Sequence, residues 1–148
     1  SWTLTTIGVD RLAVQRMAPP SLVPETINVV TQPLSDEQLA QYYRDSDVLV
    51  CPSLVEGFGL PVVEAMACGL PVICSRIESL REVAGQAAAG WFNPYDSRDI
   101  AGQIRSCLDD EDALRRASVK GIEQASRYSW DAVAARVNAV IESVCNQA

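Results

Sequence analysis

The sequence contains no histidine, and Lys120 is its single lysine among twelve basic residues. Because imidazole is the usual general base near neutral pH and a common zinc ligand, its absence excludes histidine-dependent catalysis and most zinc chemistries. Long apolar runs are also missing, since none reaches the roughly 18 residues that a membrane-spanning helix needs. The N-terminus lacks the basic and then apolar pattern of a signal peptide. We therefore expect a cytoplasmic protein without a transmembrane segment.

Basic residues are outnumbered by acidic ones, twelve against nineteen, which gives a net charge of −7. This balance argues against nucleic acid as a partner, because binding its phosphates needs clustered cations. The five cysteines are odd in number, show no C-x-x-C spacing and fall mostly within apolar segments. That usage is typical of buried thiols in a reducing compartment. The length of 148 residues predicts a single domain spanning residues 1–148.

Strand and helix patterns alternate along most of the chain. The predicted strands are Trp2 to Val9, Ile27 to Val30, Val48 to Cys51, Pro71 to Cys74 and Gly90 to Phe92. The predicted helices are Ser35 (as cap) to about Arg44, Pro61 to Cys68, Arg98 to Leu108, Glu111 to Ser126 and Trp130 to Cys145. Ser35 and Gln38 form a capping box for the first of them, and Gly69 ends the second. The segment from Asp10 to Pro24 fits a short helix or a surface loop. This alternation predicts an α/β fold with a doubly wound, mostly parallel, Rossmann-like sheet and flanking helices.

The stretch VEGFGLPVVE follows the predicted strand that ends at Cys51. Ligands of doubly wound sheets bind beyond the carboxyl ends of the strands, where this stretch begins. Gly57 and Gly59 allow a close backbone approach or an unusual turn. The helix predicted to start at Pro61 points its free N–H groups and positive dipole end at the same space, which favours a phosphate.

Two carboxylates flank this turn. Glu56 precedes it, and Glu64 lies one turn into the following helix. Carboxylates accept hydrogen bonds from hydroxyl groups, so an acid beside an anion site suggests a sugar or ribose next to phosphate. A simpler interpretation stays open, because an acid in the first helical turn stabilises the helix dipole by about 0.3–1 kcal/mol without any ligand.

The motifs Pro52-Ser53, Glu56-Gly-Phe-Gly-Leu-Pro61, Glu64-Ala-Met-Ala-Cys-Gly69 and Pro71-Val-Ile73 together resemble the donor-binding half of the family 4 retaining glycosyltransferases, which have the GT-B fold. Two glutamates separated by seven residues are the signature of that family. The likeness covers about residues 2 to 143.

The resemblance implies a nucleotide-sugar donor, UDP- or GDP-linked, whose hexosyl unit passes to a glycan or lipid acceptor with retention, as in the family's mannosyltransferases. It implies that Glu56 is the catalytic residue, which positions hydroxyls of the transferred sugar, and that Glu64 holds the ribose. The implied donor-binding residues are Glu56, Gly57, Phe58, Gly59, Leu60 and Glu64, and the implied base pocket is Thr31, Gln32, Pro33 and Leu34. No metal and no other cofactor is expected.

The family's donor half normally begins with a strand, a glycine-rich turn and a helix whose Arg and Lys grip the diphosphate. The chain begins after that unit, so we expect a fragment of a longer two-domain enzyme whose N-terminal acceptor-binding domain lies in the same or another chain. The isolated chain is then predicted to be inactive, and any peripheral membrane contact would come through the missing domain. Two alternatives stay open. One is a non-catalytic nucleotide-sugar-binding or regulatory module, and the other is a Rossmann-like oxidoreductase domain.

Two other charged features of the sequence could be mistaken for ligand-binding groups. Asp45-Ser-Asp47 has the D-x-D form of a metal site, but it lies between a predicted helix end and a strand start, on the amino side of the sheet. Arg76 and Arg81 could lend charge to the donor site, although Arg81 fits a surface or ion-pairing role better.

Overall fold

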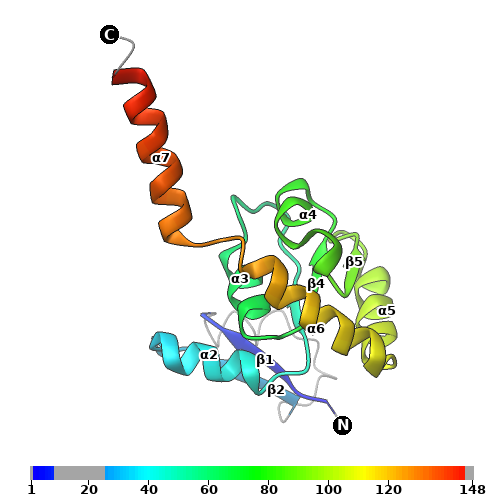
Figure 1. The fold of residues 1–148 in the computed structure, drawn as a ribbon. Coiled ribbons are helices and arrows are strands. Elements are labelled where there is room, and N and C mark those ends of the chain that lie inside the picture. Colours follow the sequence, from blue (N-terminus) through cyan, green and yellow to red (C-terminus); the bar gives the residue numbers. More distant parts are fainter. Residues whose placement is uncertain (1, 9–25, 146–148) are drawn as a thin grey trace. The chain divides into compact units, whose positions relative to one another are not determined.

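The computed structural model describes residues 2–8 and 26–145, and Figure 1 shows them as a ribbon. They form two compact units, residues 1–39 and 40–148. The segment whose structure the sequence left open, Asp10 to Pro24, lies outside the described residues.

The first unit contains a pair of parallel strands. Strand β1 (Leu4–Ile7) pairs with β2 (Ile27–Val30), with Leu4 opposite Ile27 and Ile7 opposite Val30. The bounds of β2 are those predicted. Strand β1 is shorter than the predicted span, because Trp2 and Thr3 are not part of the ladder and Val9 is outside the described residues.

Helix α2 (Asp36–Arg44) begins with the predicted capping box. The backbone N–H of Ser35 donates to Gln38 Oε1 at 2.9 Å, and the backbone N–H of Gln38 donates to Ser35 Oγ at 3.3 Å. Each side chain thus satisfies a backbone donor that the first helical turn leaves free. The capping signal in the sequence is confirmed.

The second unit is built on a three-stranded parallel sheet. Its strands are β3 (Leu49–Cys51), β4 (Val72–Ser75) and β5 (Gly90–Phe92), in the order β3-β4-β5. Cys51 pairs with Cys74, which in turn pairs with Trp91. All described strand pairs are parallel, which confirms the predicted α/β class. In a parallel sheet the carboxyl ends of all strands meet at one edge, so the segments after Cys51, Ser75 and Phe92 begin at the same edge.

The two strands without alternation differ in burial. All four residues of β4 are buried, as predicted for a central parallel strand. In β3 only Cys51 is buried, whereas Leu49 and Val50 are half-buried. Strand β3 has a neighbour on one side only within this sheet, so it is less covered than β4.

Helices cover this sheet. They are α3 (Leu60–Ala67), α4 (Glu78–Ala84) with the short 3-10 turn η2 (Gly85–Ala87), α5 (Ser97–Leu108) and α6 (Glu111–Ala125). Helix α5 packs on β5 through a core of Ile73, Phe92 and Cys107. Helices α3 and α4 pack on β4, and α6 packs against α3. The sequence predicted all of these elements except α4 and η2.

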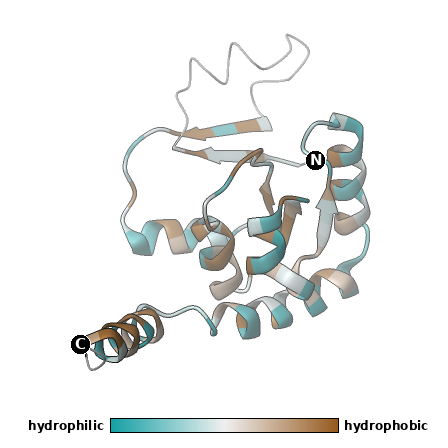
Figure 2. Cartoon of the chain, turned by 90° about the horizontal axis from the view of Figure 1, so that it is seen from above, coloured by the Kyte–Doolittle hydropathy of each residue, from teal (hydrophilic) through white to brown (hydrophobic). Residues whose placement is uncertain are grey.

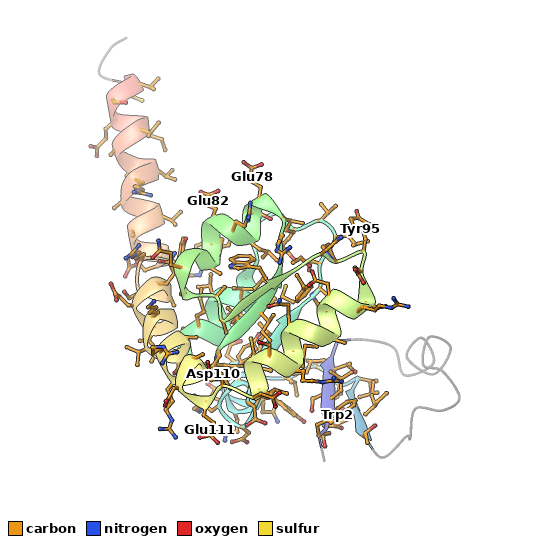
Figure 3. The ribbon with its side chains drawn as sticks, turned by 90° about the vertical axis from the view of Figure 1, so that its right-hand side faces the viewer. Trp2, Glu78, Glu82, Tyr95, Asp110 and Glu111 are labelled. Atoms are coloured by element: carbon orange, nitrogen blue, oxygen red, sulfur yellow. The ribbon has the colours of Figure 1, made fainter. Side chains whose placement is uncertain are left out.

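Acidic side chains mark the outer surface and the helix starts. Asp110, labelled in Figure 3, caps α6 by accepting the backbone N–H of Ala113 at 2.8 Å. Glu78 and Glu82 lie one turn apart on α4 and point outward, while Leu80 on the same helix is fully buried. The acidic residues that follow α5, from Asp109 to Asp112, are thus helix-start and surface charge.

The last helix, α7 (Trp130–Cys145), has the predicted bounds, but none of its residues is buried. Its apolar residues recur at helical spacing, and brown and teal alternate along it in Figure 2. Trp130, at its start, is 79% exposed. Helical spacing fixes which side chains share a face, but it does not specify what covers that face.

No helix in residues 2–8 and 26–145 is long and apolar enough to cross a bilayer.

Candidate functional site

The loop after β3 carries Glu56 and is tied to the strand ends. The buried hydroxyl of Ser75, at the end of β4, donates to the carbonyl oxygen of Cys51 at 3.2 Å. Two residues later, Ser53 Oγ donates to Glu56 Oε2 at 3.3 Å and also lies 3.6 Å from Cys51 Sγ. The half-buried Glu56 is therefore held by a hydroxyl that is itself anchored at the carboxyl edge of the sheet.

Gly59 makes the turn between this loop and α3. Its φ of 97° lies in the left-handed region, which side-chain-bearing residues rarely adopt. A Cβ at this position would lie 2.6 Å from Leu80 Cδ2 and 3.7 Å from Glu56 Cγ. Glycine is thus required both by the backbone angle and by the buried Leu80, and the stem of Glu56 lies beside the start of α3.

The N-terminus of α3 has no side-chain cap. By contrast, Asp96 caps α5 by accepting two backbone N–H groups, and Asp110 caps α6. Pro61 carries no N–H, and the N–H of Val62 donates to the carbonyl oxygen of Gly59 at 3.0 Å. The positive end of the α3 dipole therefore has no side-chain cap among the described residues. An anionic ligand would be stabilised there.

Glu64 lies one turn further along α3 and is exposed. Its Oε2 accepts a hydrogen bond of 3.1 Å from the hydroxyl of Tyr43 on α2. Burial, followed by the negative charge of Glu64, raises the pKa of Tyr43 above the usual phenol range. The hydroxyl thus stays protonated and can only act as the donor in this pair.

Phe58, between the two glycines, is held from one side by an aromatic contact. Its ring meets that of Tyr128 edge-on, with centroids 5.5 Å apart and planes at 82°. The hydroxyl of Tyr128 donates to the carbonyl oxygens of Glu82 and Val83 at 3.4 and 3.3 Å. The end of α4 thus supports the loop through Tyr128, which follows α6.

The structure brings part of the predicted site together. Glu56, Phe58 and Gly59 lie in one loop that leads into α3, and Glu64 follows on that helix. Leu60 is exposed at the start of α3, and Gly57 has open space around the position of a Cβ. The predicted base-pocket residues, Thr31 to Leu34, follow β2 in the first unit. Their role, like the ligand contacts of the others, stays a prediction.

Sequence reasoning missed four residues that support this site: Tyr43, Ser53, Leu80 and Tyr128. Ser53 stands in a motif that carries the family resemblance, but a motif does not say which atoms meet. The hydroxyl groups of Tyr43 and Tyr128 are signals of polar partners, although the sequence does not say which partners they have.

The two other charged features lie where the sequence predicted. Asp45 to Asp47 separates the end of α2 from the start of β3, on the amino side of the sheet. Arg76 lies at the carboxyl edge, where it donates to the carbonyl oxygen of Trp91 at 3.0 Å and is exposed. Arg76 is therefore a cation at the edge that carries the Glu56 loop.

Comparison with known proteins decides the family. Residues 23–124 match the family described as Glycosyl transferases group 1. The chain belongs to this glycosyltransferase family. The O-antigen chain mannosyltransferase B of Escherichia coli is 42% identical over 96 residues, which are 65% of this chain and 25% of the relative. The chain thus spans about a quarter of the length of that relative.

Solved structures show the same fold. The chain superposes on sucrose-phosphate synthase from Thermosynechococcus elongatus with a TM-score of 0.83 and 27% identity, covering 99% of this chain and 39% of that one. It also superposes on Anabaena Alr3699/HepE, solved in complex with UDP-glucose, with a TM-score of 0.75 and 19% identity, covering 89% and 35%. These neighbours confirm the predicted α/β fold of the GT-B type.

Proposed function

We propose that this chain is the donor-binding part of a retaining glycosyltransferase that transfers a hexosyl unit from a nucleoside-diphosphate sugar to a glycan or lipid acceptor. The observation that carries the proposal is the start of α3. There an uncapped helix N-terminus stands beside Glu56, and Glu64 follows one turn later on the same helix. Anion and hydroxyl recognition are thus combined within one loop and one helical turn.

Each part of the donor has a matching group. The diphosphate lies at the N-terminal end of α3, where the helix dipole stabilises negative charge. Hydroxyls of the sugar donate to Glu56, which Ser53 holds in place. Hydroxyls of the ribose donate to Glu64. A role of Thr31 to Leu34 at the base stays a prediction from the family resemblance.

The names of related proteins support the choice of donor. The relative from Escherichia coli is named as a mannosyltransferase, and the Anabaena neighbour was solved with UDP-glucose. Both names involve a hexose, so a hexosyl nucleotide is the donor class that we propose. UDP and GDP both fit the chemistry of the loop, since the diphosphate and ribose contacts are common to them.

The reaction breaks the bond between the anomeric carbon and the diphosphate, and negative charge develops on the leaving phosphate oxygen. The positive end of α3 stabilises that charge without a metal ion. Glu56 positions the sugar and stabilises the positive charge that develops at its ring. The acceptor hydroxyl attacks from the face that the leaving group occupied and passes its proton to the departing phosphate oxygen, which gives retention. Glu56 acts as a positioning and electrostatic group and forms no covalent bond.

A titration of the chain with UDP, GDP and NADH tests the binding part of this proposal. Heteronuclear NMR suits it, because without further phosphate-binding cations we expect dissociation constants in the range of about a tenth to ten millimolar. We expect either nucleoside diphosphate to shift the amide signals of residues 57–60, 62 and 63. Strong NADH binding without a response to UDP or GDP would instead favour an oxidoreductase domain.

Activity is tested on the longest natural form of the protein that contains this chain. We expect that form to transfer the hexose with the anomeric configuration of the donor, measured by NMR of the product. The 148-residue chain should bind the donor and transfer nothing. If the longer form binds the donor and also lacks transfer until a separate chain is added, the regulatory module is the better description. The cytoplasmic location stays a prediction from the sequence.

A further inference from the structure

The hydrogen bond between Tyr43 and Glu64 links helices α2 and α3, and the two residues are 21 positions apart in the sequence. Tyr43 is the buried residue of α2, whereas Glu64 is exposed on α3. The bond occupies Oε2 of the carboxylate. Within residues 26–145 no other hydrogen bond to this carboxylate is formed, so Oε1 is available to a ligand.

An exposed glutamate without a fixed partner samples several rotamers, and a ligand that binds it must immobilise it at a cost in entropy. A buried donor that holds one oxygen removes part of that cost in advance. The phenol suits this task, because Tyr43 is fixed by packing and its raised pKa keeps the hydroxyl protonated, so that it donates to the carboxylate.

We propose that Tyr43 is a positioning residue that fixes the carboxylate of Glu64 and leaves Oε1 free to accept hydrogen bonds from the ribose hydroxyls of a nucleoside diphosphate. This inference rests on the proposed function, because it needs Glu64 to contact the ribose. It goes beyond that function by assigning part of the ribose recognition to a side chain of α2 that does not touch the ligand.

The experiment compares a ribonucleotide with its analogue that lacks both ribose hydroxyls. Wild type and the Tyr43→Phe variant are titrated by NMR with UDP or GDP, whichever wild type binds more tightly, and with the matching 2′,3′-dideoxynucleoside diphosphate. We expect Tyr43→Phe to raise the dissociation constant of the ribonucleotide about 3- to 10-fold, the effect of one lost hydrogen bond. The dissociation constant of the dideoxy analogue should stay unchanged.

Tyr42→Phe is the matched control, because the hydroxyl of Tyr42, the neighbouring residue of α2, makes no hydrogen bond among the described residues. It should bind both nucleotides as wild type does. In a Glu64→Ala background, Tyr43→Phe should have no further effect on either nucleotide. This second comparison separates action through Glu64 from a general loosening of α2.

The possible outcomes distinguish the role of Tyr43 from the proposed function on which it rests. If wild type binds neither nucleotide, the proposed function fails and the role of Tyr43 fails with it. If wild type prefers the ribonucleotide and Tyr43→Phe keeps that preference in full, the role of Tyr43 alone is overturned. Equal weakening of both nucleotides would likewise overturn it, because a purely structural role would not depend on the ribose hydroxyls.

Discussion

The ring of Phe58 meets the ring of Tyr128 edge-on, with centroids 5.5 Å apart and an interplanar angle of 82°. This contact joins the glycine-containing loop to the segment between α6 and α7, seventy positions later in the chain. Tyr128 is in turn held through its hydroxyl at the end of α4. The loop that carries Glu56 is thus supported by a part of the chain that is distant in sequence.

The aromatic pair predicts a measurable coupling. Phe58→Leu, Tyr128→Leu and the double variant should show a coupling of about 0.5–1.5 kcal/mol in the free energy of unfolding, the range for edge-to-face pairs. Urea denaturation of the four proteins measures it. Strictly additive effects of the two substitutions would show that the contact contributes nothing.

Substitution by alanine should have a large effect on stability at Gly59 and a small one at Gly57. Gly59→Ala should lower the free energy of unfolding by about 2–4 kcal/mol, because φ is 97° and the added methyl group meets buried Leu80 at 2.6 Å. Gly57→Ala is the control, since nothing lies within 4 Å of its Cβ position. It should change stability by less than about 1 kcal/mol in either direction. Urea denaturation compares the two variants, and similar losses would contradict the turn geometry.

The helix caps predict a stability effect that is separate from binding. Asp110→Ala should destabilise the protein by about 0.5–2 kcal/mol, because it removes the oxygen that accepts the N–H of Ala113. Asp109→Ala removes a neighbouring charge that caps no helix start, so its effect should be smaller. Thermal unfolding by circular dichroism measures both. Nucleotide binding by the folded protein should not change in either variant.

The cysteines predict an order of chemical modification. Burial, with a smaller contribution from Cys51, raises the pKa of Cys74 to about 12. Its thiol is therefore protonated at about pH 8, and only the thiolate reacts with alkylating reagents. Cys145 is exposed. Mass spectrometry after treatment with iodoacetamide should find Cys145 modified in the native protein and Cys74 modified only after unfolding. Early modification of Cys74 would contradict its burial.

Local signals in the sequence predicted much of the fold. The Ser35 and Gln38 capping box predicted the start of α2, and Gly69, with a φ of 79°, follows the end of α3 as predicted. The strands of the parallel sheet could be predicted because apolar runs bounded by glycine or proline are short and distinct. Helix α4 could not, because it has seven residues and no side-chain cap, so neither periodicity nor a start signal marks it.

The candidate site could likewise be predicted only in part from the sequence. Glu56, Gly59 and Glu64 could be chosen from the sequence, because their chemistry and spacing are local. The contacts that support them join distant positions: Tyr43 with Glu64, Leu80 with Gly59, and Tyr128 with Phe58. Such contacts depend on how helices pack on the sheet, and no local pattern encodes that packing. Likewise, the spacing of α7 predicted its helix but not the exposure of its apolar face.

The division of work between Glu56 and Glu64 is the central claim, and one set of binding measurements tests it directly. Wild type, Glu56→Ala and Glu64→Ala are each titrated with a free nucleoside diphosphate and with the corresponding nucleotide sugar. Glu64→Ala should weaken both ligands about tenfold or more, through lost ribose contacts. Glu56→Ala should bind the free nucleotide as wild type does and weaken only the sugar-linked donor. If both variants lose the free nucleotide equally, the two glutamates do not hold different ends of one donor.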